Sequence, residues 1–478
     1  MNSAWKAACA ALTVVGLAAC AVGPNFTLPA PPAQKAYTSR PVVLPAAGES
    51  DPQQMISVGA SVPAQWWRRF GSPMLDSTVA LALADSPTLE QARATLAQAR
   101  QAVRVAEGGL YPQVELGAAL SRSRSRQAST YGAEQGNLYS AGPLVGYSPD
   151  AFGGTRRLIE QQGALADLQR EQLAAAQLSL AGNVVSQAIG IASVGAQTAA
   201  VEAILEIDRH NVDLVRLSVQ AGTAAPADLL TAQSQLAGDE ALLPPLRQQL
   251  AAAADVLAML VGRSAGNWQA PAFDFTSLVL PADLPVVVPS ALVRARPDIR
   301  GAEALLHATS AAIGVATARL YPQISLSSSW TQQSATMGAL FDGSNGLWAV
   351  AASLTAPIFN GGALKAQQQS AIDAFEAQLA TYRQTVLLAF NQVADVLQAL
   401  EHDAQLIAAQ RKALDTSTTS LRLAQDSYAA GAVSFLQVLA TQRIYEQARL
   451  GYAKAVGQRY LDTAQLFAAM GGGAAQFP

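Results

Sequence analysis

The stretch Leu110-Tyr111-Pro112-Gln113-Val114 returns 210 residues later as Leu320-Tyr321-Pro322-Gln323-Ile324. Three further pairs keep nearly the same offset: Ser86-Pro87 with Arg296-Pro297, Gly153-Gly154 with Gly361-Gly362, and Ala221-Gly222 with Ala430-Gly431. Self-similarity over such a distance predicts one structural unit that is present twice. We place the two copies at 66–262 and 290–472, joined by a Pro-rich linker at 263–289.

Each Tyr-Pro pair marks the point where a helical pattern gives way to strands. The residue before a proline is pushed out of helical geometry, so the helices predicted at 76–108 and 290–318 end there. Alternating apolar residues then predict two β-strands per copy, at 113–121, 138–148, 323–331 and 347–356. Pro143 and Pro149 fall in the second of these runs, where a proline removes a ladder donor. We therefore expect that strand to be short or to have its prolines at the ends.

A very long helix follows the strands of each copy. No proline interrupts 155–221 or 363–430, and at ~1.5 Å per residue each helix would be about 100 Å long. Residues spaced alternately by four and three form two matching seams: Val201, Leu205, Asp208, Val212, Val215 and Val219, then Gln410, Leu414, Ser417, Leu421, Ala424 and Tyr428. This spacing is typical of a coiled coil. The constant offset between the seams predicts that both copies pack in one register.

Glycine ends both long helices, and a returning helix is predicted behind each one. Gly222 and Gly431 stand where a left-handed helix cap is usual. The returning helices are predicted at 223–262 and 432–470, and Pro244-Pro245 should kink the first of them. Each copy therefore predicts a helical hairpin.

Two strands per copy give four strands per chain, which are too few to close a β-barrel. Inside a bilayer every backbone donor and acceptor has to be paired within protein, so an open four-stranded sheet is excluded there. Three chains would supply twelve strands, a workable number for an outer-membrane barrel. The predicted fold class is a mixed α+β membrane protein, with a trimeric twelve-stranded β-barrel continued by a long α-helical coiled-coil barrel.

The N-terminus is typical of a bacterial export signal. Lys6 precedes a short apolar stretch, and Leu17-Ala18-Ala19-Cys20 resembles a lipobox, in which cleavage before the cysteine is followed by acylation of its thiol. We predict a signal peptide at 1–19, a lipid on Cys20, an N-terminal extension at 20–65 and a flexible tail at 473–478. An ordinary cleavage site with an incidental cysteine is the alternative.

The composition and the motifs restrict which ligands and which reactions are expected of the chain. The formal net charge is -3, only 14% of residues are charged and no basic run occurs, so nucleic acid is not expected as a partner. His210, His307 and His402 are scattered, without a second ligand at metal-binding spacing, and the G-x-x-x-x-G-K-[ST] motif is absent from the sequence. We expect no enzyme activity, no metal and no cofactor beyond the lipid.

The stretch 172–201 contains no Asp, Glu, Lys or Arg, but glutamine and asparagine interrupt it. We interpret this stretch as a helix buried between other helices, with a membrane span as the alternative.

Five motifs carry a family resemblance: Cys20-Ala21-Val22-Gly23-Pro24-Asn25-Phe26, Trp66-Trp67, Arg296-Pro297-Asp298-Ile299-Arg300, Ile313-Gly314-Val315-Ala316 and Pro357-Ile358-Phe359-Asn360-Gly361-Gly362. In this order they resemble the TolC-like outer-membrane efflux proteins, specifically the lipoprotein branch of OprM and NodT type. The resemblance covers essentially the whole mature chain. It implies a homotrimer, lipid-anchored in the outer membrane of a Gram-negative cell, that docks onto a periplasmic adaptor and an inner-membrane pump. Such a trimer would conduct small molecules passively through a helical periplasmic tunnel.

The resemblance also assigns roles to particular residues. The hairpin tips, Ala221-Gly222-Thr223 and Ala430-Gly431-Ala432, would contact the adaptor, although a tight turn alone would also require small residues. Asp228 and Gln437 would lie at the tunnel constriction. Gln437 stands where relatives commonly carry a carboxylate, and Asp228 is equally well explained as a helix-start carboxylate favoured by the helix dipole.

A lipid-anchored periplasmic coiled-coil scaffold or adaptor is the alternative function. Adaptors also carry helical hairpins, but they lack paired amphipathic strands in the middle of each copy. The sequence does not indicate the transported substrate, the gating residues or the identity of the pump.

Overall fold

The structure is a computed structural model of the chain and describes residues 21–30, 33–44, 54–126 and 133–473. The chain forms two compact units, each built from both sequence copies. Unit 1 comprises Met1–Pro29, Thr95–Arg170 and Gly301–Arg383. Unit 2 comprises Ala30–Ala94, Glu171–Arg300 and Gln384–Pro478. The predicted signal peptide, Cys20 and the tail beyond Gly473 lie outside the described residues.

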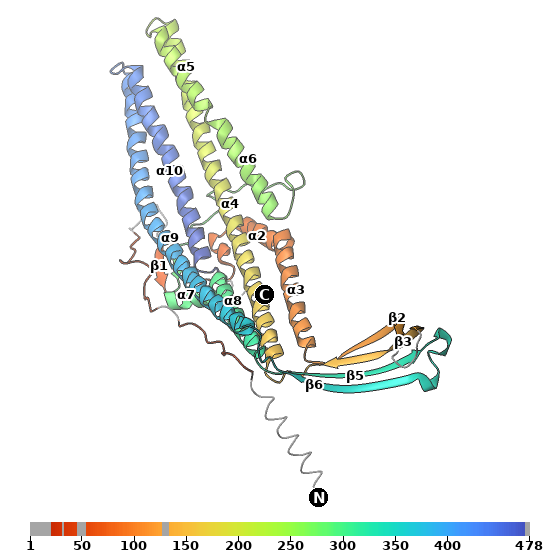
Figure 1. Cartoon of the computed structure of the whole chain (residues 1–478). Helices are drawn as coiled ribbons and strands as arrows, with labels where there is room; N and C mark the ends of the chain where they lie inside the picture. Colours follow the sequence, from red (N-terminus) through yellow and green to blue (C-terminus); the bar gives the residue numbers. More distant parts are fainter. Residues whose placement is uncertain (1–20, 31–32, 45–53, 127–132, 474–478) are drawn as a thin grey trace. The chain divides into compact units, whose positions relative to one another are not determined.

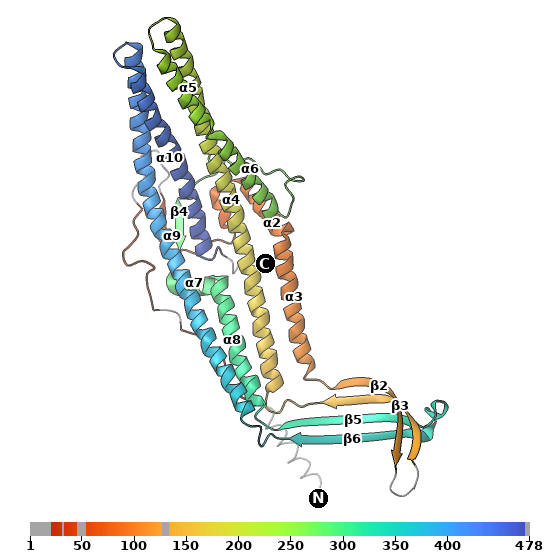
Figure 2. The ribbon, with the colours of Figure 1, turned by 45° about the horizontal axis from the view of Figure 1, so that its top comes forward.

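Unit 1 contains a four-stranded antiparallel sheet (Figures 1 and 2). Its strands are β2 (Gln113–Arg126), β3 (Ala133–Tyr147), β5 (Gln323–Ser334) and β6 (Gly346–Thr355). The order is β2-β3-β5-β6, so each copy supplies one hairpin and the β3–β5 pair joins the two hairpins. Among the described residues, β2 and β6 therefore each have a neighbouring strand on one side only.

The strands extend beyond their predicted ends, most of all in the first hairpin. The prediction for β2 stopped at Ser121, where the apolar alternation stops, but the β2–β3 ladder continues to the pair Arg126 and Ala133. Because ladder hydrogen bonds join backbone groups, a polar segment such as Ser121-Arg122-Ser123 can prolong a strand without an apolar pattern. The hydrophobic periodicity indicated where the hairpin lies and not how far it reaches.

Pro143 lies inside β3, where the sequence led us to expect prolines only at the strand ends. It stands opposite Leu116 of β2, whereas the ladder to β5 is interrupted at Gly142 and Pro143 and resumes at Leu144. A Cβ atom at Gly142 would collide with the carbonyl oxygen of Trp330. The missing N–H of the proline is accommodated by this local gap, and the strand is not shortened. Pro149 lies beyond the end of β3.

Unit 2 contains two helical hairpins, which lie side by side in Figures 1 and 2. The first consists of α4 (Gly154–Gln220), α5 (Pro226–Glu240) and α6 (Leu243–Leu260). The second consists of α9 (Ala363–Ala429) and α10 (Phe435–Ala469). Both long helices begin in unit 1 and continue into unit 2.

The predicted seams form the core between these hairpins. Val201, Leu205 and Val215 are at most 1% exposed, and the core cluster near the tips joins members of α4, α5, α9 and α10. This cluster consists of Val212, Val215, Ala232, Leu421, Ala424, Phe435 and Val438. Asp208 also occupies a seam position and is 2% exposed, which makes it the charged exception in an apolar seam.

Proline divides three helical segments that the sequence analysis treated as continuous. In the first returning helix, the kink predicted at Pro244-Pro245 is a break between α5 and α6, directly before these prolines. The segment predicted at 76–108 is α2 (Pro73–Asp85) and α3 (Pro87–Gly108), and the segment predicted at 290–318 is α7 (Pro289–Ala295) and α8 (Pro297–Ala318). Proline is well suited to the first turn of a helix, so each one starts a new helix here.

Two short strands in unit 2 were missed in the sequence. β1 (Met55–Val58) lies in the predicted N-terminal extension and β4 (Asp283–Val286) in the predicted linker, and they pair in parallel. Four residues are too few for a clear periodicity, and their pairing joins positions more than 220 residues apart. Beside them, the 3-10 helix η1 (Trp66–Phe70) places Trp66 in a stacked contact with Phe467, with ring centroids 5.5 Å apart.

The uncharged stretch at 172–201 lies within α4. By length and composition α4 is the one described helix that could cross a membrane, with a mean hydropathy of 1.5 over 18 residues. Leu180, Val184, Ile189 and Ala192 of this stretch are buried at helical spacing. The helix is packed on one side against its neighbours in unit 2, as expected of a buried helix in a bundle.

A buried polar cluster lies in unit 2, between α9 and α10. Asp403 and the guanidinium of Arg459 are buried, and Arg459 donates hydrogen bonds to Gln54 Oε1 and to the carbonyl of Leu400. Burial, and then the neighbouring carboxyl of Asp462, raise the pKa of Asp403 to about 7. At neutral pH this carboxyl is therefore partly protonated in the folded chain.

We predict that replacing Asp403 with asparagine flattens the dependence of stability on pH. A carboxyl with a raised pKa stabilises the fold fully below its unfolded-state value, near 4, and this contribution is lost as the pH rises through about 7. Between pH 5 and pH 8 the loss is on the order of 2 kcal/mol in the wild type and smaller in Asp403→Asn. Thermal melting of the detergent-purified protein at both pH values measures it. The exposed Asp415→Asn is the control, and an equal pH slope in all three proteins would refute the prediction.

Candidate functional site

The sheet of unit 1 has one apolar face that is exposed to its surroundings. Val114, Leu116 and Leu120 on β2 are 63–83% exposed, and Trp348, Val350 and Leu354 on β6 are 68–76% exposed. In both strands these side chains recur at every second position, so each set points to one side of the sheet. The cross-strand register shows that both sets lie on the same side. Directly opposite residues share a side, and Ala118, Ala141, Gln332 and Gly346 form such a line across the four strands; Ala118 is two residues from Leu116, and Gly346 is two residues from Trp348.

The other face of the sheet is mostly small and polar, although Leu138, Leu144 and Leu347 also lie on it. On β5 it carries Ser325, Ser327, Ser329 and Thr331, and on β6 it carries Ser353, whose hydroxyl lies 2.6 Å from that of Ser325. An apolar face opposite a polar face, with alternation along each strand, is typical of a strand that separates lipid from an aqueous lumen. The strands can therefore serve as the wall of a water-filled pore.

The hairpin tips are built by a shared backbone motif. At the first tip the N–H of Thr223 donates to the carbonyl of Ser218 (2.9 Å), and the N–H of Gly222 donates to that of Val219 (3.1 Å). At the second tip Ala432 and Gly431 make the corresponding bonds to Ser427 (2.8 Å) and Tyr428 (2.9 Å). This pair of hydrogen bonds is the Schellman motif, which requires a residue in the left-handed backbone conformation.

Both tip glycines have the conformation that the motif requires. Gly222 and Gly431 each have φ of 72°, and a Cβ atom added at either would have no neighbour within 4 Å. The glycines are therefore explained by backbone conformation and not by crowding. Ala221 and Ala430, which precede them, are exposed.

The two predicted constriction residues differ in their surroundings. Asp228 is half-buried in the first turn of α5, where its Oδ2 accepts a hydrogen bond from the N–H of Ala225 at 3.1 Å. This carboxylate therefore satisfies one of the free donors at the start of the helix. Gln437 is exposed in the first turn of α10. Each residue lies six positions after its tip glycine, so the two stand at equivalent levels of the two hairpins.

In unit 1 the chain directly after Cys20 is held against α4 and α8. The guanidinium of Arg157 donates to the carbonyl of Val22 (3.0 Å) and to Asn25 Oδ1 (2.8 Å). Gly23 has φ of 94°, and a Cβ atom there would lie 2.5 Å from the Cα atom of Gly314. Two of the motifs that carried the resemblance, around residues 23 and 314, are thus in direct contact.

His307 also takes part in this attachment, a role that its position in the sequence did not indicate. Its ring stacks on Phe26 with centroids 4.5 Å apart, and its Nε2 lies 2.9 Å from Glu160 Oε1. The sequence did not indicate this aromatic partner, because Phe26 is far from His307 along the chain.

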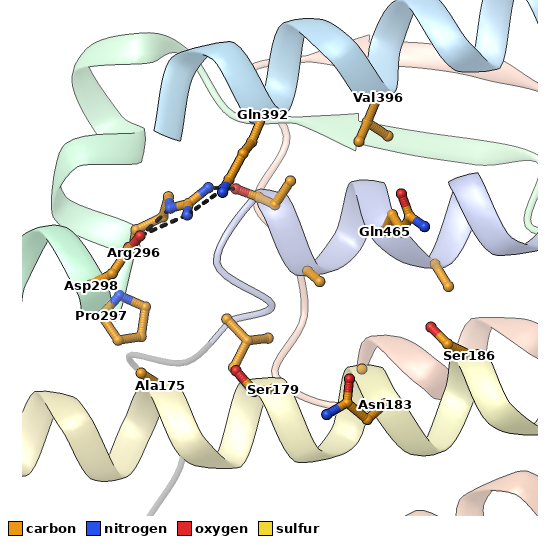
Figure 3. Close-up of a pocket in the computed structure, with 15 residues that line it drawn as sticks. Ala175, Ser179, Asn183, Ser186, Arg296, Pro297, Asp298, Gln392, Val396 and Gln465 are labelled. Carbon is orange, nitrogen blue, oxygen red and sulfur yellow. Dashed lines mark hydrogen bonds and ion pairs between the residues drawn. The ribbon is translucent and has the colours of Figure 1, made fainter. Parts of the chain in front are cut away.

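The Arg296-Pro297-Asp298 motif borders a pocket of about 490 Å³ in unit 2 (Figure 3). Arg296 makes a two-bond ion pair with Asp298 (3.0 and 2.7 Å) and also donates to Gln392 Oε1 and to the carbonyl of Ala469. All three guanidinium nitrogens are thereby used. The motif connects the α7–α8 junction to α9 and α10, and it leaves no free cationic group for an anionic ligand.

Comparison with known proteins identifies the family of this chain. The outer membrane efflux protein family matches residues 78–263 and 288–472, which is more than half of the chain. The pyoverdine export outer membrane protein OpmQ of Pseudomonas aeruginosa is 30% identical over 437 residues, covering 90% of each chain. Nodulation protein T of Rhizobium leguminosarum bv. trifolii is 27% identical, covering 92% of this chain and 91% of that protein.

A solved structure shows the same fold. The outer-membrane channel OprN superposes with a TM-score of 0.85 at 26% identity and covers 95% of this chain and all of its own. Two family matches separated by a short gap also coincide with the two sequence copies. The chain belongs to the outer membrane efflux protein family.

Proposed function

We propose that three copies of this chain close a twelve-stranded barrel in the outer membrane and continue it as a helical tunnel into the periplasm. As a member of the outer membrane efflux proteins, the chain is an exit duct of tripartite efflux systems. The observation that carries the trimer is the four-stranded sheet with an exposed apolar face and two open edges.

The open edges favour closure between chains. In lipid, an unpaired N–H or C=O group costs several kcal/mol, so β2 and β6 both need a further strand. Pairing β2 of one chain with β6 of the next satisfies both edges at once and repeats around a closed ring. Four strands per chain and three chains give twelve strands, and their serine-lined face would then border the lumen.

A lipid on Cys20 fits the position of the first described residues. Ala21 lies against Gly153, directly after the end of the first strand pair, since a Cβ atom at Gly153 would be 2.5 Å from the Cα atom of Ala21. An acyl chain on the preceding residue would thus start near the end of the strands proposed to cross the bilayer. It could therefore enter the leaflet at that end of the strands. The barrel and the lipid would both anchor the protein.

The surfaces of the hairpin tips indicate which partners the chain binds. Exposed alanines on either side of each turn allow a partner helix to approach closely, and helix-in-groove packing is a common form of recognition. We assign the tips to a periplasmic adaptor, through which the duct would serve an inner-membrane pump. Pyoverdine and toluene, named for relatives of this chain, indicate small molecules as the transported class, conducted without a chemical reaction.

We predict that a charge on the apolar face of β6 abolishes assembly, whereas the same charge one residue further along does not. Val350→Arg places a cation in lipid at a cost of roughly 2–4 kcal/mol per chain, while Ala351→Arg points to the lumen. Outer-membrane fractions analysed by electrophoresis without boiling should contain a heat-modifiable trimer for the wild type and Ala351→Arg only. A soluble monomer from the wild type would instead favour the periplasmic scaffold.

The same preparation tests the lipid. The mature wild-type chain should carry the mass of acyl groups on its N-terminal residue, and Cys20→Ser should lack it while still forming the trimer, because the barrel alone anchors the protein. A wild-type mature chain without this added mass would exclude the lipid and leave the barrel unaffected.

We predict that charges at the tips weaken adaptor binding without unfolding the hairpins. Ala221→Asp and Ala430→Asp leave the left-handed glycines intact, and a carboxylate buried against a partner helix should weaken binding roughly tenfold or more. Cross-linking to the adaptor in cells, together with dye efflux, measures the effect. Ala237→Asp, exposed on α5 away from the tip, is the control. Unchanged cross-linking in both tip variants would exclude the tips as the contact.

We predict that Asp228 contributes to the ion preference of the tunnel. Asp228→Asn removes the charge but keeps an oxygen that can accept from the N–H of Ala225, so the helix start is preserved. Single-channel recording in planar bilayers should show a weaker cation preference for Asp228→Asn and a stronger one for Gln437→Asp, since a charged ring at a narrow point sets selectivity. If Asp228→Asn has wild-type conductance and selectivity, the carboxylate is only a helix cap.

A further inference from the structure

Three acidic side chains meet where the two hairpins of unit 2 pack together. Asp208 comes from α4, Asp239 from α5 and Glu446 from α10, and one carboxylate oxygen of each lies within 4.8 Å of the other two. Asp208 and Glu446 are 2% and 6% exposed, and Asp239 is half-buried. The cluster therefore combines three negative groups from three helices in a largely dry interface.

Amide side chains hold these carboxylates in place. Gln442 Nε2 donates both to Asp208 Oδ1 and to Glu446 Oε1, the latter at 2.7 Å. Gln235 Nε2 donates to Asp239 Oδ2 at 2.6 Å and to Glu446 Oε2 at 3.4 Å. Each amide thus bridges two acids and fixes their separation without neutralising any charge.

One buried oxygen in the centre of this arrangement has no partner. Asp208 Oδ2 is inaccessible to solvent and has no N–H or O–H donor of another residue within hydrogen-bond reach in the described part of the chain. Arg443 reaches the cluster through Gln235, to whose Oε1 it donates at 2.8 Å. A buried carboxylate with a free oxygen is costly unless a proton or a cation satisfies it.

The electrostatics agree with a deficit of positive charge. Burial raises the pKa of Asp208 to about 7, and the charges of Glu446 and Asp239 and a hydrogen bond between the Asp208 and Asp239 carboxyls, which needs a proton on one of them, add to this effect. Burial likewise raises the pKa of Glu446, and the charge of Arg443 offsets this only in part. The site therefore favours either a proton or a small cation.

We propose that Asp208, Asp239 and Glu446 bind one divalent cation of the calcium type, which cross-links the two hairpins of a chain. Carboxylate oxygens are the ligands that Ca²⁺ prefers, at 2.3–2.6 Å, so two ligands on opposite sides of the ion are about 5 Å apart. The 4.8 Å limit on the oxygen separations is compatible with that size. Ca²⁺ also tolerates an irregular and incomplete protein shell completed by water, which suits ligands on three separate helices.

The position of this site distinguishes it from the tunnel constriction. Asp208 precedes Gly222 by fourteen residues and Glu446 follows Gly431 by fifteen, so at ~1.5 Å per residue the site lies about 20 Å from the tips. Its ligands are buried within one chain, and they do not form a ring around a symmetry axis. The bound cation would restrain movement of one hairpin against the other within that chain.

Another buried acid pair of unit 2 also has an oxygen that is unpaired among the described residues, Asp403 Oδ2, but it has a cationic side chain beside it. Asp403 and Asp462 have Arg459 beside them, whose charge lowers the pKa of Asp403 and opposes the effect of burial. A built-in guanidinium already supplies the positive charge there. At the hairpin cluster the charge has to come from solution.

Calcium binding to the detergent-purified full-length protein tests the proposal. After removal of metals with EDTA, CaCl₂ is titrated by isothermal calorimetry into the wild type, Asp208→Asn, Glu446→Gln and the control Glu240→Gln, an exposed neighbour of Asp239. We expect one site per chain in the wild type and the control, with a Kd at or below roughly 10⁻³ M. Both cluster variants should bind at least tenfold more weakly, and MgCl₂ should bind more weakly than CaCl₂ in the wild type.

Thermal melting provides a second readout that does not depend on heat signals. CaCl₂ should raise the melting temperature of the wild type relative to EDTA and leave that of Glu446→Gln unchanged. Absence of saturable calcium binding, or binding that Asp208→Asn and Glu446→Gln retain, overturns the proposal. Cluster variants that are more stable than the wild type at pH 8, combined with no calcium effect on the wild type, would show that protons alone satisfy the carboxylates.

Discussion

The unpaired outer edges of β2 and β6 constrain the rest of the structure. Their apolar side chains need lipid, and their backbone groups cannot enter lipid unpaired, so a single sheet has no stable environment of its own. A closed ring of identical sheets removes this conflict without any new sequence element. In the proposed trimer the two hairpins of one chain would have the same symmetry, since α4 and α9 each start a few residues after a strand ends. A tubular helical region would then be a consequence of the proposed barrel.

The paired seams show how the duplicated unit became a single core. Their constant offset places equivalent side chains of α4 and α9 at equivalent heights, and the buried cluster at the tips draws on both hairpins. The copies differ where Asp208 corresponds to Ser417, both of them buried. Only the first copy therefore brings a carboxylate into the seam, where Asp239 and Glu446 meet it. The polar cluster thus lies at a seam position where the two copies differ in sequence.

Local rules predicted the elements that local interactions determine. The glycine caps at Gly222 and Gly431, the coiled-coil seams and the division of each copy into helices and strands all depend on residues within a few turns of one another. The strand ends, the β1–β4 pair and the contact of Gly23 with Gly314 depend on partners hundreds of residues away, and no periodicity indicates them. For the same reason the acidic cluster was not predicted, although Asp208 already stood out as a charged seam residue. Pro143 was predicted to lie at a strand end or to shorten the strand, and this was wrong because a local gap in the β3–β5 ladder accommodates the missing N–H donor of the proline.

A carboxylate in an apolar seam costs stability, so its retention calls for a physical reason. Sliding one hairpin along the other by one heptad would move Asp208 away from Gln442 and place its charge at the buried level that Val201 or Val215 of the same helix now occupies. Only one register lets the amides of Gln442 and Gln235 reach all three acids. A polar group at a seam position is known to specify register at a cost in stability. The cluster would therefore fix the relative height of the hairpins whether a cation or a proton occupies it, and a cation would add strength to a register that the amides already define.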